Sequence, residues 1–298
     1  MLMKKEYLYA GIAILAWGTS ATSVKLMQGS LDTVFLLFGV SLTAAVFLCI
    51  VCGVQGRFRK LREYSAGTIF RMILIGLVGM FVYNALYMRA VECMPAQQAY
   101  MLNYFWPALI VVFSGFLLKE KLTFWKVGAV LVSFAGVLIY SADGNLKSLF
   151  TSKAEGVTFA LLGAVVYSLY SVLNKRESYD KFLCITIACV TSAACSLVWV
   201  LASGQIHLVQ TANWGGLIYQ GVVCIGTAYL AWAYAMDAGD TAKVSTLSYL
   251  TPFVSLIFTC VFLGEKVTAY SAAGIIFVIM GIILQERPWG KKNTAVKA

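Results

Sequence analysis

Charged residues are scarce in this sequence. Asp, Glu, Lys and Arg make up only 12% of its 298 residues, whereas 60% of the residues are hydrophobic and the mean hydropathy is +0.82. A typical soluble domain carries about one quarter charged residues. This chain has too few polar residues to cover a soluble fold of its size, and its composition predicts a membrane protein.

Histidine is almost absent, and no carboxylate lies inside an apolar run. The single histidine, His207, lies in a short polar connection, and all 13 acidic residues lie at the ends of apolar runs or between them. Seven of the eight cysteines lie inside apolar runs, where cysteine behaves as a small hydrophobic residue. Metal sites and catalytic sites need converging ligands or titratable groups. We therefore expect no metal, no cofactor, no disulfide framework and no enzymatic activity.

Apolar runs of about 20 residues, the length that crosses a bilayer as a helix, follow one another along the chain. They fall at 7–27, 33–53, 68–91, 95–118, 123–141, 156–174, 181–202, 214–236, 241–263 and 268–286. The runs are continuous, whereas the strands of a membrane barrel alternate between apolar and polar residues. The first run is longer than the core of a secretory signal and is expected to remain as a helix. We predict an all-α membrane protein with ten transmembrane helices; the short joins at 118–123 and 263–268 leave this count open by one.

The basic residues are distributed unevenly between the two sides that these runs define. With a cytoplasmic N-terminus, 18 of the 23 lysines and arginines fall on the cytoplasmic side. Because cytoplasmic loops are enriched in basic residues, we expect a multi-pass protein of the cytoplasmic membrane with both termini inside. This topology accounts for the net charge of +10 without a nucleic-acid partner. The expected partners are the lipid bilayer and a small-molecule substrate, and the protein is expected to work as a monomer.

An internal repeat relates residues 145 positions apart. FLLKEKLT at 116–123 aligns with VFLGEKVT at 261–268. The aligned pairs include Tyr104 with Tyr249, Pro107 with Pro252, Glu120 with Glu265, and Gly136 with Gly281. The repeated Glu-Lys pair is interpreted as the place where a tight helical hairpin surfaces from the membrane.

The repeat divides the chain into two units, 1–142 and 143–298, with five apolar runs each. An odd number of spans makes the second unit enter the membrane from the opposite side, so we predict two inverted five-helix repeats. Inverted repeats are the plan of many secondary transporters, whose substrate site lies near the midplane where the halves meet. A duplication also serves simple bundle construction, and a scaffold or receptor stays open as an alternative to a transporter.

Three sets of residues resemble a known family. They are ILAWGTSATSVK in the first run, NALYMRA at the end of the third, and the pattern P-x(10)-L-x-E-K-x-T at 107–123 and again at 252–268. Together they resemble the EamA family of the drug/metabolite transporter superfamily over essentially the whole chain. The resemblance implies a ten-helix fold of two halves, a central cavity open to one side at a time, and export of small metabolites such as amino acids.

Uncharged polar and aromatic side chains are the groups inside the runs that can bind a substrate. Tyr83 and Tyr87 are four residues apart, and Tyr229 and Trp232 are three apart, so each pair lies on one helix face. The side-chain amides of asparagines need partners in a membrane. The candidate substrate-binding residues are Trp17, Ser20, Tyr83, Asn84, Tyr87, Tyr100, Asn103, Tyr104, Tyr167, Tyr229, Trp232, Ser248 and Tyr249. For single residues of this set, interface anchoring and helix packing remain the alternatives.

Two of only four prolines, Pro107 and Pro252, occupy equivalent positions inside the fourth and ninth runs. A proline within a helix bends it and frees the carbonyl four residues earlier. We therefore predict a kink, or hinge, at each proline, close to the substrate site. A packing kink without ligand contact is the alternative.

Charged residues at span ends also recur in the two halves. They are Lys25 with Lys175, and Glu92 with Asp237. Anchoring at the membrane interface explains all four. The alternatives are contact of the lysines with an anionic group of the substrate, and a gating or proton-linked role for the carboxylates.

The predicted function is export of small neutral or zwitterionic metabolites, amino acids above all, by alternating access. The chain has no G-x-x-x-x-G-K loop for ATP, so transport is secondary or downhill. The small multidrug relatives of the superfamily carry a glutamate in their first span that this chain lacks, which disfavours antiport of lipophilic cations with protons. The alternatives are a broad-specificity drug or metabolite efflux carrier and an importer of the same fold.

Overall fold

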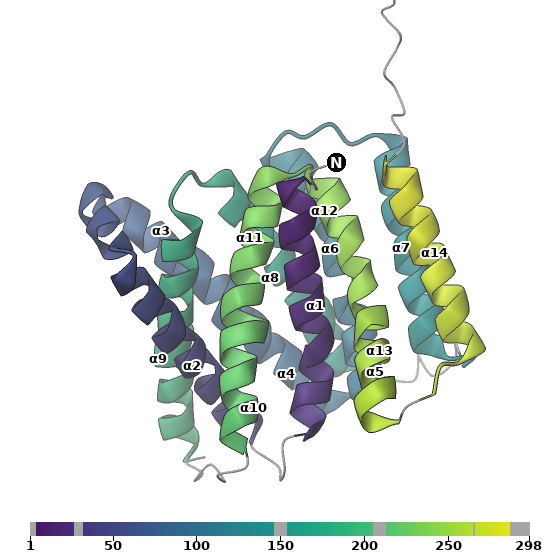
Figure 1. The fold of residues 1–298 in the computed structure, drawn as a ribbon, viewed down its shortest axis with the longest axis horizontal. Coiled ribbons are helices and arrows are strands. Elements are labelled where there is room, and N and C mark those ends of the chain that lie inside the picture. The colour runs from purple at the N-terminus through teal and green to yellow at the C-terminus, as the bar shows by residue number, and fades with distance from the viewer. Residues whose placement is uncertain (1–3, 27–31, 146–153, 205–212, 265, 287–298) are drawn as a thin grey trace, which may run out of the picture.

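The structure is a computed structural model that describes residues 4–26, 32–145, 154–204, 213–264 and 266–286. His207 and Glu265 lie outside these residues. Within them the chain is helical and contains no strand. Its helices lie side by side as a bundle of long rods joined by short connections (Figure 1). The all-α class expected from the apolar runs is confirmed.

The first half of the chain supplies five helical rods. They are α1 (Lys5–Leu26), α2 (Thr33–Val54), the chain of α3 (Ala66–Gly76), η2 (Leu77–Val82) and α4 (Tyr83–Cys93), the pair α5 (Ala96–Asn103) and α6 (Trp106–Leu117), and α7 (Phe124–Ala142). A short 3-10 helix, η1 (Arg57–Glu63), connects α2 to α3.

The second half repeats this order. Its rods are α8 (Ala154–Arg176), α9 (Lys181–Ser203), the chain of α10 (Trp214–Tyr219), η5 (Gln220–Thr227) and α11 (Ala228–Ala238), the chain of α12 (Thr241–Leu247), η6 (Ser248–Leu250) and α13 (Thr251–Leu263), and α14 (Ala269–Glu286). Each predicted run is thus occupied by a helix or a chain of helices, within a few residues of the predicted ends.

Nine of the rods in the described residues are long and apolar enough to cross a membrane. The remaining rod, α1, has 22 residues but falls outside this set. Serine and threonine crowd its second half, at Thr19, Ser20, Thr22 and Ser23, which lowers its apolar character. Composition and length therefore support nine spans, and the tenth rests on the position of α1 between α11 and α13 (Figure 1).

The third and eighth rods both contain a π-helical segment, at matching places of the repeat. These segments are η2 and η5. At or next to the end of each of them, a side chain donates a hydrogen bond to a backbone carbonyl. The Asn84 amide nitrogen donates to the Met80 carbonyl at 2.5 Å, and the Thr227 hydroxyl donates to the Val222 carbonyl at 2.8 Å. Inside a bilayer such bonds satisfy carbonyls that a regular helix would pair with its own amides.

The fourth and ninth rods are interrupted next to their prolines. Pro107 and Pro252 each lie in the first turn of a new helix, α6 and α13, rather than inside a continuous one. The physical reason is that first-turn amides have no partner within their helix, so a residue without an N–H fits there at no cost. Each predicted hinge is therefore a break between two helices, at Tyr104–Phe105 and at η6.

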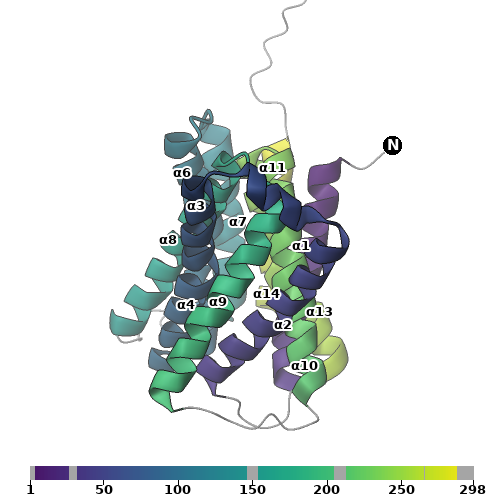
Figure 2. The ribbon, with the colours of Figure 1, turned by 90° about the vertical axis from the view of Figure 1, so that its left-hand side faces the viewer.

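Close helix contacts recur in the two halves at the same offset. A Cβ at Gly76 would lie 2.6 Å from the Ala188 Cα, and a Cβ at Gly221 would lie 1.9 Å from the Thr43 hydroxyl. Gly76 and Gly221 are 145 residues apart, and so are Thr43 and Ala188. The third rod therefore meets α9 as the eighth rod meets α2. Figure 2 shows α2 and α9 next to each other in the turned view, and the two helices pack together.

Glycines also allow close contact between α7 and α14, and these contacts too recur at an offset of 145 residues. A Cβ at Gly136 would lie 2.5 Å from the Gly274 carbonyl oxygen, and a Cβ at Gly281 would lie 2.6 Å from the Ala129 carbonyl oxygen. Gly281 is the counterpart of Gly136, and Gly274 is the counterpart of Ala129, so the two contacts are equivalent under the repeat. Ser133, which bonds to the Val278 carbonyl at 3.4 Å, lies opposite its own counterpart.

The two ends of the bundle differ in their contacts. The end that carries the start of α1, the α6–α7 connection and the α11–α12 connection is called the N-side end. Lys126 meets Asp240 there at 2.6 Å, and the Tyr7 hydroxyl donates to Glu286 at 2.7 Å. At the opposite end, called the far end, the Thr268 hydroxyl donates to Asp143 at 2.7 Å.

Asp180 joins two connections at the N-side end. Its carboxylate lies 2.9 Å from Arg57 and 2.6 Å from Lys60, and it also caps α9 by accepting from the Leu183 amide. Burial opposes the charged form, but the hydrogen bond and charge of Lys60, with Arg57 and the Leu183 amide, prevail and lower the pKa of Asp180 below its ordinary value. This lowered pKa stabilises the fold at neutral pH, and the stabilisation is lost as pH falls through the folded-state value.

Asp180→Asn should lower the stability of the protein by about 1–2 kcal/mol at pH 7, because a hydrogen-bonded charge pair loses its charge. The measurement is the thermal unfolding midpoint in detergent from pH 3 to pH 8. The difference from the wild-type protein should stay constant above about pH 5 and shrink below about pH 4. A difference that is independent of pH down to pH 3 would contradict the assignment.

Gly136→Ala should destabilise the protein by about 1–3 kcal/mol, because the added methyl group meets a backbone oxygen that cannot move away alone. Gly128 of the same helix provides the matched control, since a Cβ there has nothing within 4 Å. Gly128→Ala should be neutral or slightly stabilising. Equal thermal midpoints for the two variants would show that α7 and α14 do not depend on this close approach.

Candidate functional site

Aromatic rings from four helices meet in the interior of the bundle. We call Trp17, Trp106, Tyr167, Tyr229 and Trp232 the aromatic cluster. The ring centroids of Trp106 and Tyr167 lie 4.9 Å apart, those of Trp106 and Trp232 5.3 Å, and those of Trp17 and Trp232 5.6 Å. Most of these contacts are edge-to-face, the geometry that the aromatic quadrupole favours. The cluster joins α1 and α6 of the first half to α8 and α11 of the second.

A set of tyrosines extends the cluster along the bundle. We call Tyr83, Tyr87, Tyr100, Tyr104 and Tyr249 the tyrosine extension. The Tyr83 ring lies 4.8 Å from Tyr167, and Tyr104 lies 6.4 Å from both Trp106 and Tyr249. The Tyr100 and Tyr104 hydroxyls are hydrogen-bonded at 2.9 Å. The predicted aromatic residues are therefore brought together into one continuous group.

Asn103 places an amide at the edge of this group. Its nitrogen donates to the Tyr83 hydroxyl at 2.9 Å, and the residue is only 4% exposed. Its oxygen has no hydrogen-bond partner within the described structure. Buried polar atoms are nearly always paired. The unpaired amide oxygen of Asn103 beside these rings therefore offers a hydrogen bond to a ligand.

Three predicted residues form hydrogen bonds with groups outside the aromatic cluster. Ser20 donates to the Gln220 side chain at 3.1 Å, Ser248 donates to the Ser245 carbonyl at 2.6 Å, and Asn84 bonds within its own helix as described above. These bonds stabilise helix breaks and helix contacts. The geometry accordingly gives Ser20 and Ser248 structural contacts, whereas Asn84 also interacts with the Tyr229 hydroxyl of the aromatic cluster.

Trp106 is the central residue that the sequence prediction leaves out. It is 5% exposed, it contacts Trp17, Tyr104, Tyr167 and Trp232, and its carbonyl accepts a hydrogen bond from Ser168 of α8 at 2.8 Å. The feature of the sequence that points to Trp106 is its position directly before Pro107. A residue at the start of a helix next to the site is held in a fixed orientation. Tyr170 is a second omission, with its ring 5.7 Å from that of Tyr167.

A pocket of about 450 Å³ opens between α1, α10 and α13 toward the far end. Its lining is uncharged and consists of Thr19, Thr22, Ser23, Leu26, Gly216, Tyr219, Phe258 and Phe262. Thr19, which is hydrogen-bonded to Tyr219 at 2.7 Å, lies two residues beyond Trp17 of the aromatic cluster. The pocket is thus next to α1 just below the cluster.

The charged residues at span ends are paired. Glu92 lies 2.6 Å from Arg89 of the same helix, and Asp237 lies 3.6 Å from Lys181. Lys175 lies 3.0 Å from Glu120 and also donates to the Gly239 carbonyl and the Thr241 hydroxyl. Lys175 therefore faces protein groups in this conformation.

The long apolar helices and their apolar surface define a multi-pass membrane protein. The model of the EamA-like transporter family matches the chain twice, at residues 4–142 and 154–285. The chain belongs to this family, a branch of the drug/metabolite transporters, and it has the two-repeat architecture of the family.

Two similar proteins are named as exporters. The chain is 30% identical to the "Aromatic amino acid exporter YddG" of Ancylobacter novellus, over 84% of this chain and 85% of that protein. It is 23% identical to a "Probable terminal-alkyne amino-acid exporter" of Streptantibioticus cattleyicolor, over 95% and 94% of the two chains. A solved protein structure matches the fold with a TM-score of 0.83 and 24% identity, over 94% of this chain and 96% of that one.

Proposed function

We propose that this protein is a secondary transporter that exports small neutral or zwitterionic amino acids across the cytoplasmic membrane by alternating access. The observation that carries the proposal is the buried aromatic cluster with the unpaired Asn103 amide oxygen at its edge. The names of two relatives, an aromatic amino acid exporter and an amino-acid exporter, support the same substrate class.

The chemistry of the site fits an amino acid in three ways. Aromatic rings pack against an apolar or aromatic side chain and favour stacked or edge-to-face contact. An ammonium group is attracted to ring faces and to the amide oxygen of Asn103. The tyrosine hydroxyls can donate to a carboxylate. A substrate with net charge would leave that charge uncompensated, because neither the cluster nor the tyrosine extension holds an ionised group.

The matched contacts of the two halves support an inverted arrangement of units 1–142 and 143–298. Gly76 with Ala188 and Gly221 with Thr43 are equivalent pairs, and the α6–α7 connection lies at the N-side end whereas Thr268, just before α14, meets the far end of α7. We infer ten spans, with α1 as the least apolar of them. The excess of basic residues supports a cytoplasmic N-side end, and we infer that the protein works as a monomer.

Uptake by vesicles that contain the purified protein tests the proposal, with a panel of radiolabelled amino acids. Phenylalanine, tyrosine and leucine should move at least about tenfold faster than lysine and glutamate, a ratio that corresponds to about 1.4 kcal/mol of discrimination. The panel is run with and without a pH gradient, which identifies proton coupling directly. Vesicles without protein give the background. If no neutral amino acid moved above that background, the substrate class would be wrong.

Asn103→Ala and Tyr104→Phe test the site itself. Asn103→Ala removes an amide that bonds Tyr83 and offers the acceptor, and the rate for a neutral amino acid should fall about tenfold or more, the cost of unpaired polar groups. Tyr104→Phe removes one hydroxyl and should have a smaller effect. Ser196→Ala is the matched control, since Ser196 is fully buried and bonds only within its own helix. Unchanged transport by both site variants would remove this pair from the site.

A further inference from the structure

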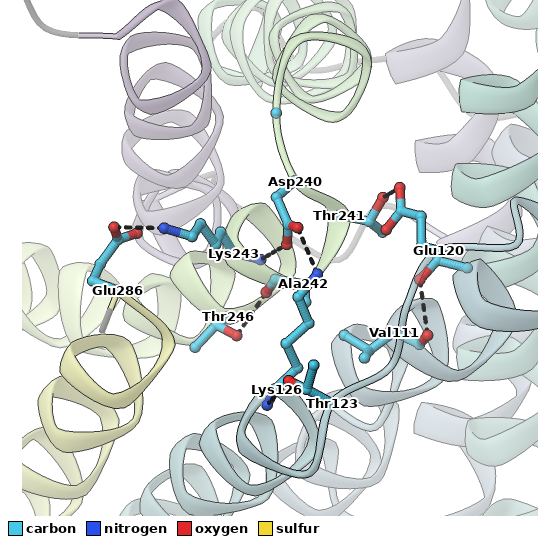
Figure 3. A network of polar contacts seen from close by, with 12 residues as sticks. Val111, Glu120, Thr123, Lys126, Asp240, Thr241, Ala242, Lys243, Thr246 and Glu286 are labelled. Atoms are coloured by element: carbon cyan, nitrogen blue, oxygen red, sulfur yellow. Dashed lines mark hydrogen bonds and ion pairs between the residues drawn. The ribbon is translucent and has the colours of Figure 1, made fainter. Parts of the chain in front are cut away.

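Glu120 of the repeated Glu-Lys motif is more than a surface charge. It lies on the α6–α7 connection, its carboxylate is 3.0 Å from the Lys175 ammonium group, and it accepts a hydrogen bond from the Thr241 hydroxyl at 2.6 Å. Lys175 also donates to the Gly239 carbonyl at 2.8 Å and to Thr241 at 2.7 Å. Figure 3 shows Glu120 and Thr241 facing each other across the gap between their two connections.

A second ion pair lies beside the first. The Lys126 ammonium group of α7 lies 2.6 Å from the Asp240 carboxylate, and Asp240 caps α12 by accepting from the Lys243 amide at 3.2 Å (Figure 3). Burial opposes the charged form of Asp240, but the hydrogen bond and charge of Lys126 outweigh it and keep the pKa of Asp240 below its ordinary value. The pair is therefore ionised at neutral pH. The neighbouring Lys243–Glu286 pair, 2.7 Å apart, ties α12 to α14.

These contacts join the two halves of the chain next to the helices that carry the aromatic cluster. Glu120 follows α6, which begins with Trp106, and Lys175 lies near the end of α8, which contains Tyr167. Asp240 follows α11, which contains Trp232, and Thr241 begins α12, the first helix of the rod that contains Tyr249. When these ion pairs and hydrogen bonds form, they hold α6, α8 and α11 together at the N-side end.

The Lys126–Asp240 pair has no charged counterpart at the far end, whereas Glu120 and Lys175 correspond to the charged residues Glu265 and Lys25. At an offset of 145 residues, Pro95 corresponds to Asp240, Ala96 to Thr241, and Ser271 to Lys126. None of the three counterparts can form an ion pair. The pocket of about 450 Å³ also lies toward the far end. The Lys126–Asp240 ion pair is therefore a property of one end of the molecule, although the fold repeats at both.

We propose that Glu120, Lys126, Lys175, Asp240 and Thr241 form a latch that holds the N-side end of the transport path closed, and that these residues separate each time the path opens toward that end. The latch residues are positioning residues: they set which end is open, and they do not contact the substrate in this conformation. The inference rests on the proposed transport by alternating access. It gives the repeated Glu-Lys motif a role in the first half of the chain.

The pairs are partly buried, which sets the size of the expected effect. The side chains of Lys175 and Glu120 are 16% and 23% exposed, and those of Lys126 and Asp240 are 23% and 35% exposed. The free energy contributed by such a pair is larger than that of an exposed ion pair, which is small. It is smaller than the cost of disrupting a fully buried pair. We expect loss of one pair to raise the opening equilibrium at the N-side end about three- to tenfold, within the range between these limits.

Hydrogen exchange of the full-length protein in lipid nanodiscs measures this opening without any substrate. Glu120→Gln keeps the shape of the side chain and removes its charge, and Lys126→Gln breaks the second pair independently. In both variants, residues 118–126 and 238–246 should exchange about three- to tenfold faster than in the wild-type protein. Exchange of residues 268–272 at the far end should be unchanged. The charge swap Glu120→Lys with Lys175→Glu should restore part of the protection.

Glu92→Gln is the matched control, because Glu92 pairs at 2.6 Å with Arg89 of its own helix and joins no two helices. It should leave exchange at the N-side end unchanged. Wild-type exchange in both latch variants, or an equal rise at both ends, would overturn the latch. Because this readout needs no substrate, failure of the latch and failure of the proposed amino acid export are distinguishable.

Discussion

The hydrocarbon interior of a bilayer supplies no hydrogen bonds, and this constraint shapes every part of the molecule. Backbone groups are paired inside helices, and the positions where a helix departs from regularity are bonded locally or across a helix contact, as at Asn84, Thr227 and Ser168. Ionised groups are confined to the ends, where pairs such as Lys126–Asp240 form. The uncharged aromatic cluster is therefore the chemically distinct feature of the interior.

The same constraint explains how far the sequence predicts the structure. Apolar runs must be helices of a given length, so the rods fall within a few residues of their predicted positions. The Tyr and Trp residues chosen for helical spacing do meet, because rings on one face of neighbouring helices have few other places to pack. The helix α1 is the least apolar of the rods, because serine and threonine lower its hydropathy.

The remainder depends on contacts between distant residues, which a single sequence does not contain. Pro107 and Pro252 predicted bends but not that each begins a new helix, because the preceding turn can either continue past a proline or stop before it. Ser20 and Ser248 looked available, yet each has a partner, one of them 200 residues away. Glu120 looked like a hairpin charge because Lys175 and Thr241 reach it only through the folded arrangement of the two halves.

The paired glycine contacts of α7 and α14 have a consequence for the history of the chain. Gly136 meets Gly274, and Gly281 meets Ala129, so each side of the interface makes the contacts that its counterpart makes on the other side. A self-complementary surface of this kind is isologous, the type that joins two identical subunits around a two-fold axis. A protein with only one copy of the unit would already possess the surface needed to form a homodimer through this helix. Fusion of two such copies would then preserve the interface within one chain and leave each copy free to diverge, as the charges of the N-side end have done.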